Sequence, residues 1–125
     1  MWTVELADEF EAEFLALPVT VQDEALAMAR LLQTFGPLLK RPHADTLAGS
    51  KHTNMKELRF DAADGVWRIA FAFDTQRNGI LLVAGNKSGV GQKAFYRELI
   101  RKADQRFDAH LERITKGRKH ATKRK

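Results

Sequence analysis

The amino-terminal third of the chain opens on an alternating pattern and then changes to helical spacing. Residues 2–6 alternate between apolar and polar positions, which predicts a short strand. Two segments with an apolar residue at every third or fourth position follow, separated by Pro18 and ended by Gly36-Pro37. So short a connection predicts a helical hairpin. The inward stripes are expected to be Phe10, Phe14 and Leu17, then Val21, Ala25, Met28 and Leu32.

Polar residues indicate where these helices start. Asp8, with Glu11 three positions later, matches a capping box for the first helix, and Thr20 is the expected cap of the second. Residues 36–53 then lose all periodicity and contain two prolines and two glycines. They predict a long loop with one helical turn near Asp45.

Strand-like alternation returns at residue 55. Residues 55–60 and 66–73 each place their bulky apolar side chains on one face, and the DAADG sequence between them has the composition of a turn. The register follows from this parity, because a shift of one residue would exchange the two faces. Pairing Phe60 with Trp67 gathers the apolar side chains on a single face and puts Leu58 beside Ile69.

The same register brings two arginines together on the other face. Arg59 is expected beside Arg68, with Ala70 and Ala72 forming a shallow floor next to them. Like charges directly opposite on paired strands cost stability unless an anion neutralises them. A bound polyanion could do this, and so could the neighbouring Glu57. The pattern therefore fits an anion-binding surface, and it fits equally an exposed face whose arginines meet only Glu57 and water.

The rest of the pattern predicts a buried strand, a glycine-rich turn and a long helix. Residues 80–84 are continuously apolar, as in a central strand covered on both faces. The turn at 85–91 presents Lys87 but lacks the glycine spacing of a Walker motif. An apolar stripe at i, i+4 spacing predicts a helix from Gln92 to residue 114. Tyr96 lies in its first turns, where it could stack on a base, act as an acid or pack at the rim of the core. The basic edge of this helix is Lys93, Arg97 and Arg101.

Composition narrows the classes of protein that fit. A chain of 125 residues that is 44% hydrophobic and 30% charged is expected to form one domain, at residues 1–115, with a flexible basic tail at 116–125. Cysteine is absent, no apolar run is long enough for a membrane span, and the start lacks a signal-peptide pattern. A cytoplasmic protein with no membrane partner is expected. His43, Asp45 and His52 match no metal-ligand spacing, so neither a metal nor another cofactor is expected.

The distribution of charge points to a polyanion. The net charge is +5, yet the charged residues between positions 5 and 24 are all acidic and those between 116 and 125 are all basic. Such asymmetry indicates a basic surface that binds a polyanion, with the acidic helices facing elsewhere. For the tail taken alone, a solvated segment without a partner is the other interpretation.

The order of the elements and several of their sequences resemble the RelE/ParE superfamily of toxins from bacterial toxin–antitoxin modules, and in particular its HigB-like, phage-derived branch. The resemblance covers roughly residues 2–111. It is carried by KELRF at 56–60, WRIAF at 67–71, ILLV at 80–83 and a lysine-bearing turn into a helix with Ala103-Asp104. It implies an α+β, RelE-like fold with a small, curved, mainly antiparallel sheet. The implied order is strand–helix–helix–strand–strand–strand–helix, with the helical hairpin and the last helix backing the sheet.

The resemblance also implies a function. Toxins of this kind in type II modules are endoribonucleases (mRNA interferases) that cut mRNA on the ribosome and inhibit translation, restrained by an antitoxin that is often of the helix-turn-helix type. Arg59 and Arg68 would clamp the scissile phosphate, Lys56 or Lys87 would handle the 2′-hydroxyl, and Tyr96 would stack or donate a proton. The residues expected to bind RNA around them are Lys51, Lys93, Arg97 and Arg101.

Two alternatives stay open. A ParE-like toxin would keep the fold and inhibit DNA gyrase without any nuclease activity. A non-catalytic, nucleic-acid-binding regulator would use the basic helix and tail only to hold phosphates.

Overall fold

One sheet of five strands, in the order β1-β5-β4-β3-β2, organises the part of the chain that the structure describes. This computed structural model describes the backbone of residues 1–123 and the side chains of residues 1–117. The strands are β1 (Thr3–Leu6), β2 (Ala44–Thr46), β3 (Lys56–Ala62), β4 (Gly65–Phe73) and β5 (Asn78–Asn86). The helices are α1 (Asp8–Leu15), α2 (Val19–Phe35), the short 3₁₀ helix η1 (Gly36–Leu38) and α3 (Gln92–Lys123).

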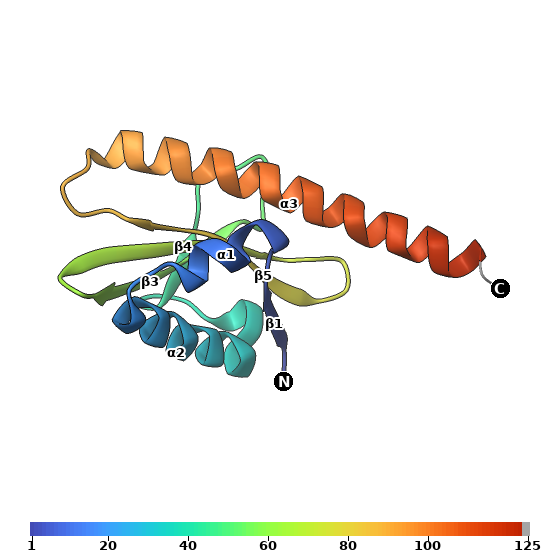
Figure 1. Ribbon diagram of the computed structural model, residues 1–125, viewed down its shortest axis with the longest axis horizontal. Coiled ribbons are helices and arrows are strands. Elements are labelled where there is room, and N and C mark those ends of the chain that lie inside the picture. The colour runs from blue at the N-terminus through green and yellow to red at the C-terminus, as the bar shows by residue number, and fades with distance from the viewer. Residues whose placement is uncertain (124–125) are drawn as a thin grey trace.

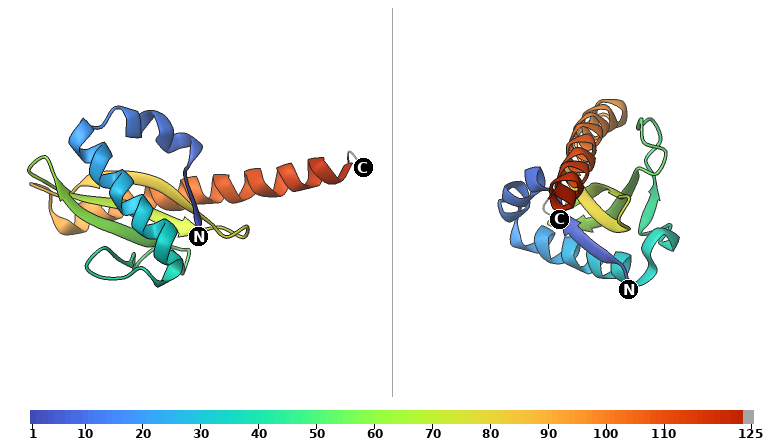
Figure 2. Two further views of the ribbon diagram at one scale, coloured as in Figure 1. Left: turned by 90° about the horizontal axis from the view of Figure 1, so that it is seen from below. Right: turned by 90° about the vertical axis from the view of Figure 1, so that its right-hand side faces the viewer.

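Helices cover both faces of the sheet (Figures 1 and 2). The helices α1 and α2 lie on one side, and α3 crosses the other. On the first side α2 packs on β3 and α1 packs on β5, so each helix of the predicted hairpin contacts the sheet directly. On the second side Phe95 of α3 lies so close to Gly85 of β5 that an added Cβ would come within 2.8 Å of its ring. A residue without a side chain is therefore what lets α3 approach the sheet.

The predicted register of the central hairpin is confirmed. Phe60 pairs with Trp67, and Arg59 pairs with Arg68 in the antiparallel β3–β4 ladder. The β4–β5 pair is also antiparallel, with an irregularity at Ala70/Phe71, whereas β1 joins β5 in parallel. The sheet is thus mixed but mainly antiparallel, and the predicted α+β fold class is confirmed.

Three local predictions near the helix starts and in the long loop are wrong. Ala7, not Asp8, is the N-cap of α1, and Pro18 takes that position for α2; neither cap uses a side-chain hydrogen bond. Asp8 and Thr20 lie inside the first turns instead. The segment near Asp45 is the short strand β2, not a helical turn, and it pairs with β3. Three residues are too few for alternation to be visible, and pairing along the edge of β3 decides their conformation.

The helix α3 extends well past the sheet (Figure 1). It continues through Lys123, so helical backbone covers most of the segment expected to be a tail, and residues 124–125 lie outside the described part. Its middle is fixed to the β4–β5 turn, where the buried carboxylate of Asp74 accepts a hydrogen bond at 2.9 Å from the backbone N–H of Asn78 and contacts His110 Nε2 at 2.8 Å. Within the described residues, no helix is both long and apolar enough to cross a membrane.

Arg106 joins α3 to the middle of β5 and to α1, and its loss should destabilise the fold in a pH-dependent way. Its guanidinium donates to the Leu82 carbonyl at 2.9 Å and to both carboxylate oxygens of Glu13 in α1 at 2.8 and 2.6 Å. Hydrogen bonds to charged groups contribute about 1.5–3 kcal/mol. We therefore expect Arg106→Met to lower the free energy of unfolding by about that amount at neutral pH, as measured by denaturant titration.

The sign of the pH dependence follows from Glu13. The hydrogen bond from Arg106 holds the pKa of Glu13 below its ordinary value of 4.5. The contribution of the ion pair is therefore present above that value and is lost as the pH falls through the lowered pKa. The difference in stability between the two proteins should then shrink in acid to the part that the Leu82 carbonyl contributes. Arg101→Met is the matched control, because Arg101 is exposed and pairs with Glu98 of its own helix; it should change stability by less than about 1 kcal/mol. An Arg106 effect that stayed constant into acid would contradict the ion pair as its source.

Candidate functional site

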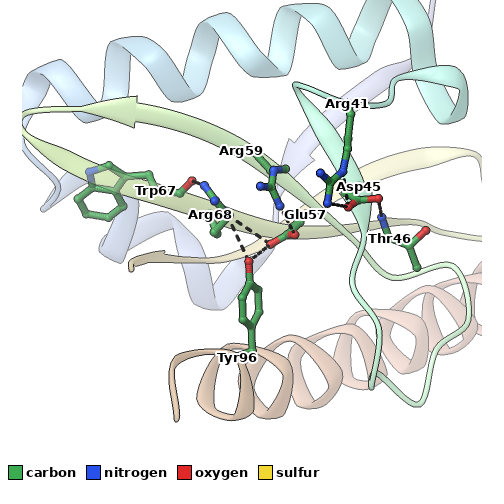
Figure 3. Close-up of polar contacts among 8 residues, drawn as sticks. All are labelled: Arg41, Asp45, Thr46, Glu57, Arg59, Trp67, Arg68 and Tyr96. Atoms are coloured by element: carbon green, nitrogen blue, oxygen red, sulfur yellow. Dashed lines mark hydrogen bonds and ion pairs between the residues drawn. The ribbon is translucent and has the colours of Figure 1, made fainter. Parts of the chain in front are cut away.

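A buried carboxylate joins the two arginines that the register brings together. Glu57 on β3 is only 4% exposed and lies on the same face as both guanidinium groups (Figure 3). Arg59 Nη1 donates to Glu57 Oε2 at 3.0 Å, and Arg68 Nε lies 3.7 Å from Glu57 Oε1. One carboxylate thus balances part of the charge of two adjacent cations, which offsets the cost of placing them side by side.

Tyr96 of α3 is the third residue that contacts Glu57. It extends from the first turns of α3 toward the sheet, where its hydroxyl donates to Glu57 Oε1 at 2.9 Å and accepts a bond from Arg68 Nε at 3.3 Å (Figure 3). Burial raises the pKa of Tyr96; the bond from Arg68 works against this, and the contact with Glu57 adds to it. The phenol therefore keeps its proton at neutral pH, as a proton donor must.

The small residues near the arginines are buried, and they do not form the expected open floor. Ala70 and Ala72 are fully buried, and the side chain of Arg68 is only 7% exposed. Arg68 Nη1 also donates to the Trp67 carbonyl at 2.9 Å, which fixes the guanidinium in place. Arg59 keeps more freedom, since 24% of its side chain is exposed. The prediction of a shallow exposed surface is wrong because α3 packs over this face.

The two arginines still reach the surface in a groove at the edge of β3. The groove has a volume of about 400 Å³, and both guanidinium-bearing side chains line it together with Met28 of α2 and residues of β3. Its rim also carries acidic groups, Glu24 and Asp61. Beside it, Arg41 binds Asp45 at 2.8 Å (Figure 3).

Lys87 joins the cluster and Lys56 does not. Lys87 follows β5 directly, and its Nζ lies 5.7 Å from the centre of the Tyr96 ring, within the range of a cation–π contact. Lys56 immediately precedes Glu57 on β3, so strand alternation turns it to the opposite face. There its Nζ donates to the Pro37 carbonyl at 3.0 Å. The expected pairing of Lys56 with the arginines is therefore not what the structure shows.

The residues expected to bind RNA around this cluster divide into two pairs. Lys93 and Arg97 are exposed and line one surface hollow with Tyr96. Lys51 instead forms an ion pair with Asp108 of α3, and Arg101 forms one with Glu98. The first pair extends the cluster along the start of α3, whereas the charges of the second pair are already balanced within the protein.

Glu57 has a larger part in the cluster than its sequence position predicts. The sequence indicates only a neighbour that could neutralise the arginines, yet Glu57 contacts every member of the cluster except Lys87. Strand parity put it on the arginine face, and that signal was available. Its contact with Tyr96 was not visible, because nothing in the sequence placed α3 over this face.

Three comparisons relate the chain to known proteins. Residues 12–108 match the family model described as phage-derived protein Gp49-like. The chain is 37% identical over 125 residues to HigB2 of Mycobacterium tuberculosis, covering 99% of this chain and 61% of that protein. It is 41% identical over 106 residues to HigB3 of the same organism, covering 85% of this chain and 90% of that one. Both relatives are named as toxins; the chain spans about three fifths of the length of the first and most of the second.

The fold is also found among solved structures. A mutant of the E. coli toxin RelE in the free state superposes with a TM-score of 0.61, covering 84% of this chain and 96% of that one at 11% sequence identity. At so low an identity the match concerns the fold, which agrees with the mainly antiparallel sheet and its two helical layers.

Proposed function

The chain belongs to the phage-derived Gp49-like family of RelE/HigB-like toxins, and on this premise we propose that it is the toxin of a type II toxin–antitoxin module that cleaves mRNA on the ribosome. The observation that carries the nuclease proposal is the convergence of Arg59, Arg68 and Tyr96 on one carboxylate from three separate elements. Two guanidinium groups that line an open groove, and a protonated phenol hydrogen-bonded to one of them, are the parts that a phosphodiester-cleaving site needs.

The chemistry we propose needs no metal. The 2′-oxygen attacks the adjacent phosphorus, a pentavalent phosphorane forms, and the bond from phosphorus to the 5′-oxygen breaks to leave a 2′,3′-cyclic phosphate. Arg59 and Arg68 stabilise the charge on the phosphorane, since a guanidinium is always charged and can hold two phosphate oxygens. Tyr96 gives its proton to the leaving 5′-oxygen, and Lys87 orients the 2′-hydroxyl, whose proton leaves to water.

The partners follow from the same proposal. An antitoxin, which we expect to be of the helix-turn-helix type, would restrain the toxin, and the ribosome would present the mRNA. Lys93 and Arg97, which are exposed beside Tyr96, would hold phosphates flanking the cut. The basic end of α3 would add contacts of this kind farther from the cluster.

Inducing the chain alone in a bacterial host tests this function. We expect methionine incorporation to stop within minutes, with mRNA cut inside codons and with plasmid supercoiling unchanged at that time. The matched control is Arg68→Ala, which removes a cluster guanidinium and should spare growth and translation while antibody detection shows the protein present. A loss of supercoiling before any effect on translation would contradict the nuclease proposal in favour of a gyrase-inhibiting toxin. Normal growth, with neither translation nor supercoiling affected, would contradict the proposal that the chain is a toxin.

A further inference from the structure

We propose that Glu57 is a positioning residue that acts as an internal counter-anion: it holds Arg59, Arg68 and Tyr96 in the place of the RNA phosphate, and the substrate displaces it from Arg59. This inference rests on the proposed function and adds to it a competitor built into the same site. The displaced contact is the Arg59–Glu57 ion pair, which the scissile phosphate would replace.

Both oxygens of the carboxylate are engaged in the way a phosphate would be. Oε2 accepts from Arg59 at 3.0 Å, and Oε1 accepts from Tyr96 at 2.9 Å with Arg68 at 3.7 Å. Carboxylate and phosphate groups offer a guanidinium the same arrangement of two oxygens. The donors that we propose for the phosphorane are thus already occupied by an anion of the protein.

The two arginines differ in how firmly they are held, which decides where exchange occurs. Arg68 is almost fully buried and is fixed by the Trp67 carbonyl as well as by Tyr96. Arg59 is 24% exposed, its guanidinium bonds to Glu57, and its side chain lines the groove at the edge of β3. Arg59 can therefore turn from the carboxylate to a phosphate in the groove while Glu57 continues to orient Arg68 and Tyr96.

This arrangement predicts opposite effects of Glu57→Gln on binding and on chemistry. Without the carboxylate charge, two cations face the groove, and the affinity for ribosomes programmed with 2′-O-methylated, uncleavable mRNA should rise by about threefold or more at fixed ionic strength. The oriented phenol and guanidinium are lost, so single-turnover cleavage of unmodified mRNA should slow by about 10- to 100-fold, the range known for partners that orient metal ligands. If Glu57 served stability alone, its replacement would not raise the affinity for ribosomes while lowering the cleavage rate.

The single tyrosine of the chain supplies a readout that does not require activity. The ultraviolet absorbance of phenolate reports the titration of Tyr96 alone. Because the contact with Glu57 raises the pKa of Tyr96 while Arg68 lowers it, Glu57→Gln should lower that pKa. Glu57→Asp serves for the same titration if Glu57→Gln does not fold, because its shorter side chain withdraws the carboxylate from the phenol and should likewise lower the pKa of Tyr96.

Each outcome decides one point. Tighter binding, slower cleavage and a lowered Tyr96 pKa support the inference. An unchanged Tyr96 titration in a folded Glu57→Gln protein, or weaker binding by it, overturns the inference and leaves the proposed function standing. Failure of the unmodified protein to bind programmed ribosomes overturns the proposed function, and the displacement of Glu57 by RNA falls with it. Glu57→Asp keeps the charge with a shorter side chain, so it should slow cleavage without gaining affinity.

Discussion

Replacing Arg59 by glutamine is expected to slow mRNA cleavage by about 10²–10³-fold, the loss seen when one preorganised donor to a developing oxyanion is removed. Arg59 forms an ion pair inside the protein and is the more exposed of the two arginines that line the groove. Glutamine keeps a neutral donor on a shorter side chain and cannot hold two phosphate oxygens with a fixed charge. The measurement is the single-turnover rate on programmed ribosomes, with growth arrest as the cellular counterpart.

Two further variants separate the effect of the planar guanidinium donors from the effect of their charge. Arg59→Lys retains the charge and should recover only part of the rate, because an ammonium group lacks the planar pair of donors. Arg30→Gln is the matched control, since Arg30 is exposed on α2 and its loss changes the net charge by the same amount. Equal losses for Arg59→Gln and Arg30→Gln would mean that only overall charge matters. A cleavage rate for Arg59→Gln close to that of the unmodified protein would contradict the assignment of Arg59 to the phosphate.

The arginine pair could be predicted because strand parity leaves few choices. Bulky side chains at Phe60 and Trp67 have only one buried face to share, and this fixes the partner of every other residue in the hairpin. The same rule argues against Lys56, which shares the face of Phe60. The order of residues in the resemblance places Lys56 in the catalytic set, whereas the geometry of the strand separates it from the arginines.

What the sequence left undetermined was which face the last helix would cover. Ala70 and Ala72 are equally compatible with an open floor and with a helix packed against them, because small residues permit both. The decisive feature is Gly85, where the missing side chain admits Phe95 of α3. Tyr96 is the next residue after Phe95 in α3. With α3 packed at Gly85, Tyr96 reaches Glu57 and Arg68 and completes the polar cluster. This long-range contact has no counterpart in local propensity or periodicity.

The stability of the fold should depend most on the face of β4 that lies opposite Arg68. Phe71 of β4 is 1% exposed and meets Phe73 edge to face, with ring centres 6.1 Å apart. Its strand is paired on both sides, so the surrounding backbone cannot close around a smaller side chain. We expect Phe71→Ala to lower the free energy of unfolding by about 3–5 kcal/mol, measured by denaturant titration. That is a large part of the roughly 5–15 kcal/mol that stabilises an ordinary domain.

Phe35→Ala is the matched control, because Phe35 is 50% exposed at the end of α2 and should change stability by no more than about 0.5 kcal/mol. Similar losses for the two variants would contradict the burial of Phe71 as the cause. The arginine cluster lies across the sheet from Phe71 and does not touch it. The fraction of Phe71→Ala that remains folded should therefore cleave mRNA at the unmodified rate, whereas Arg59→Gln should lose cleavage with its stability retained. The two faces of β4 would then be separable by experiment, since one maintains the fold and the other carries the chemistry.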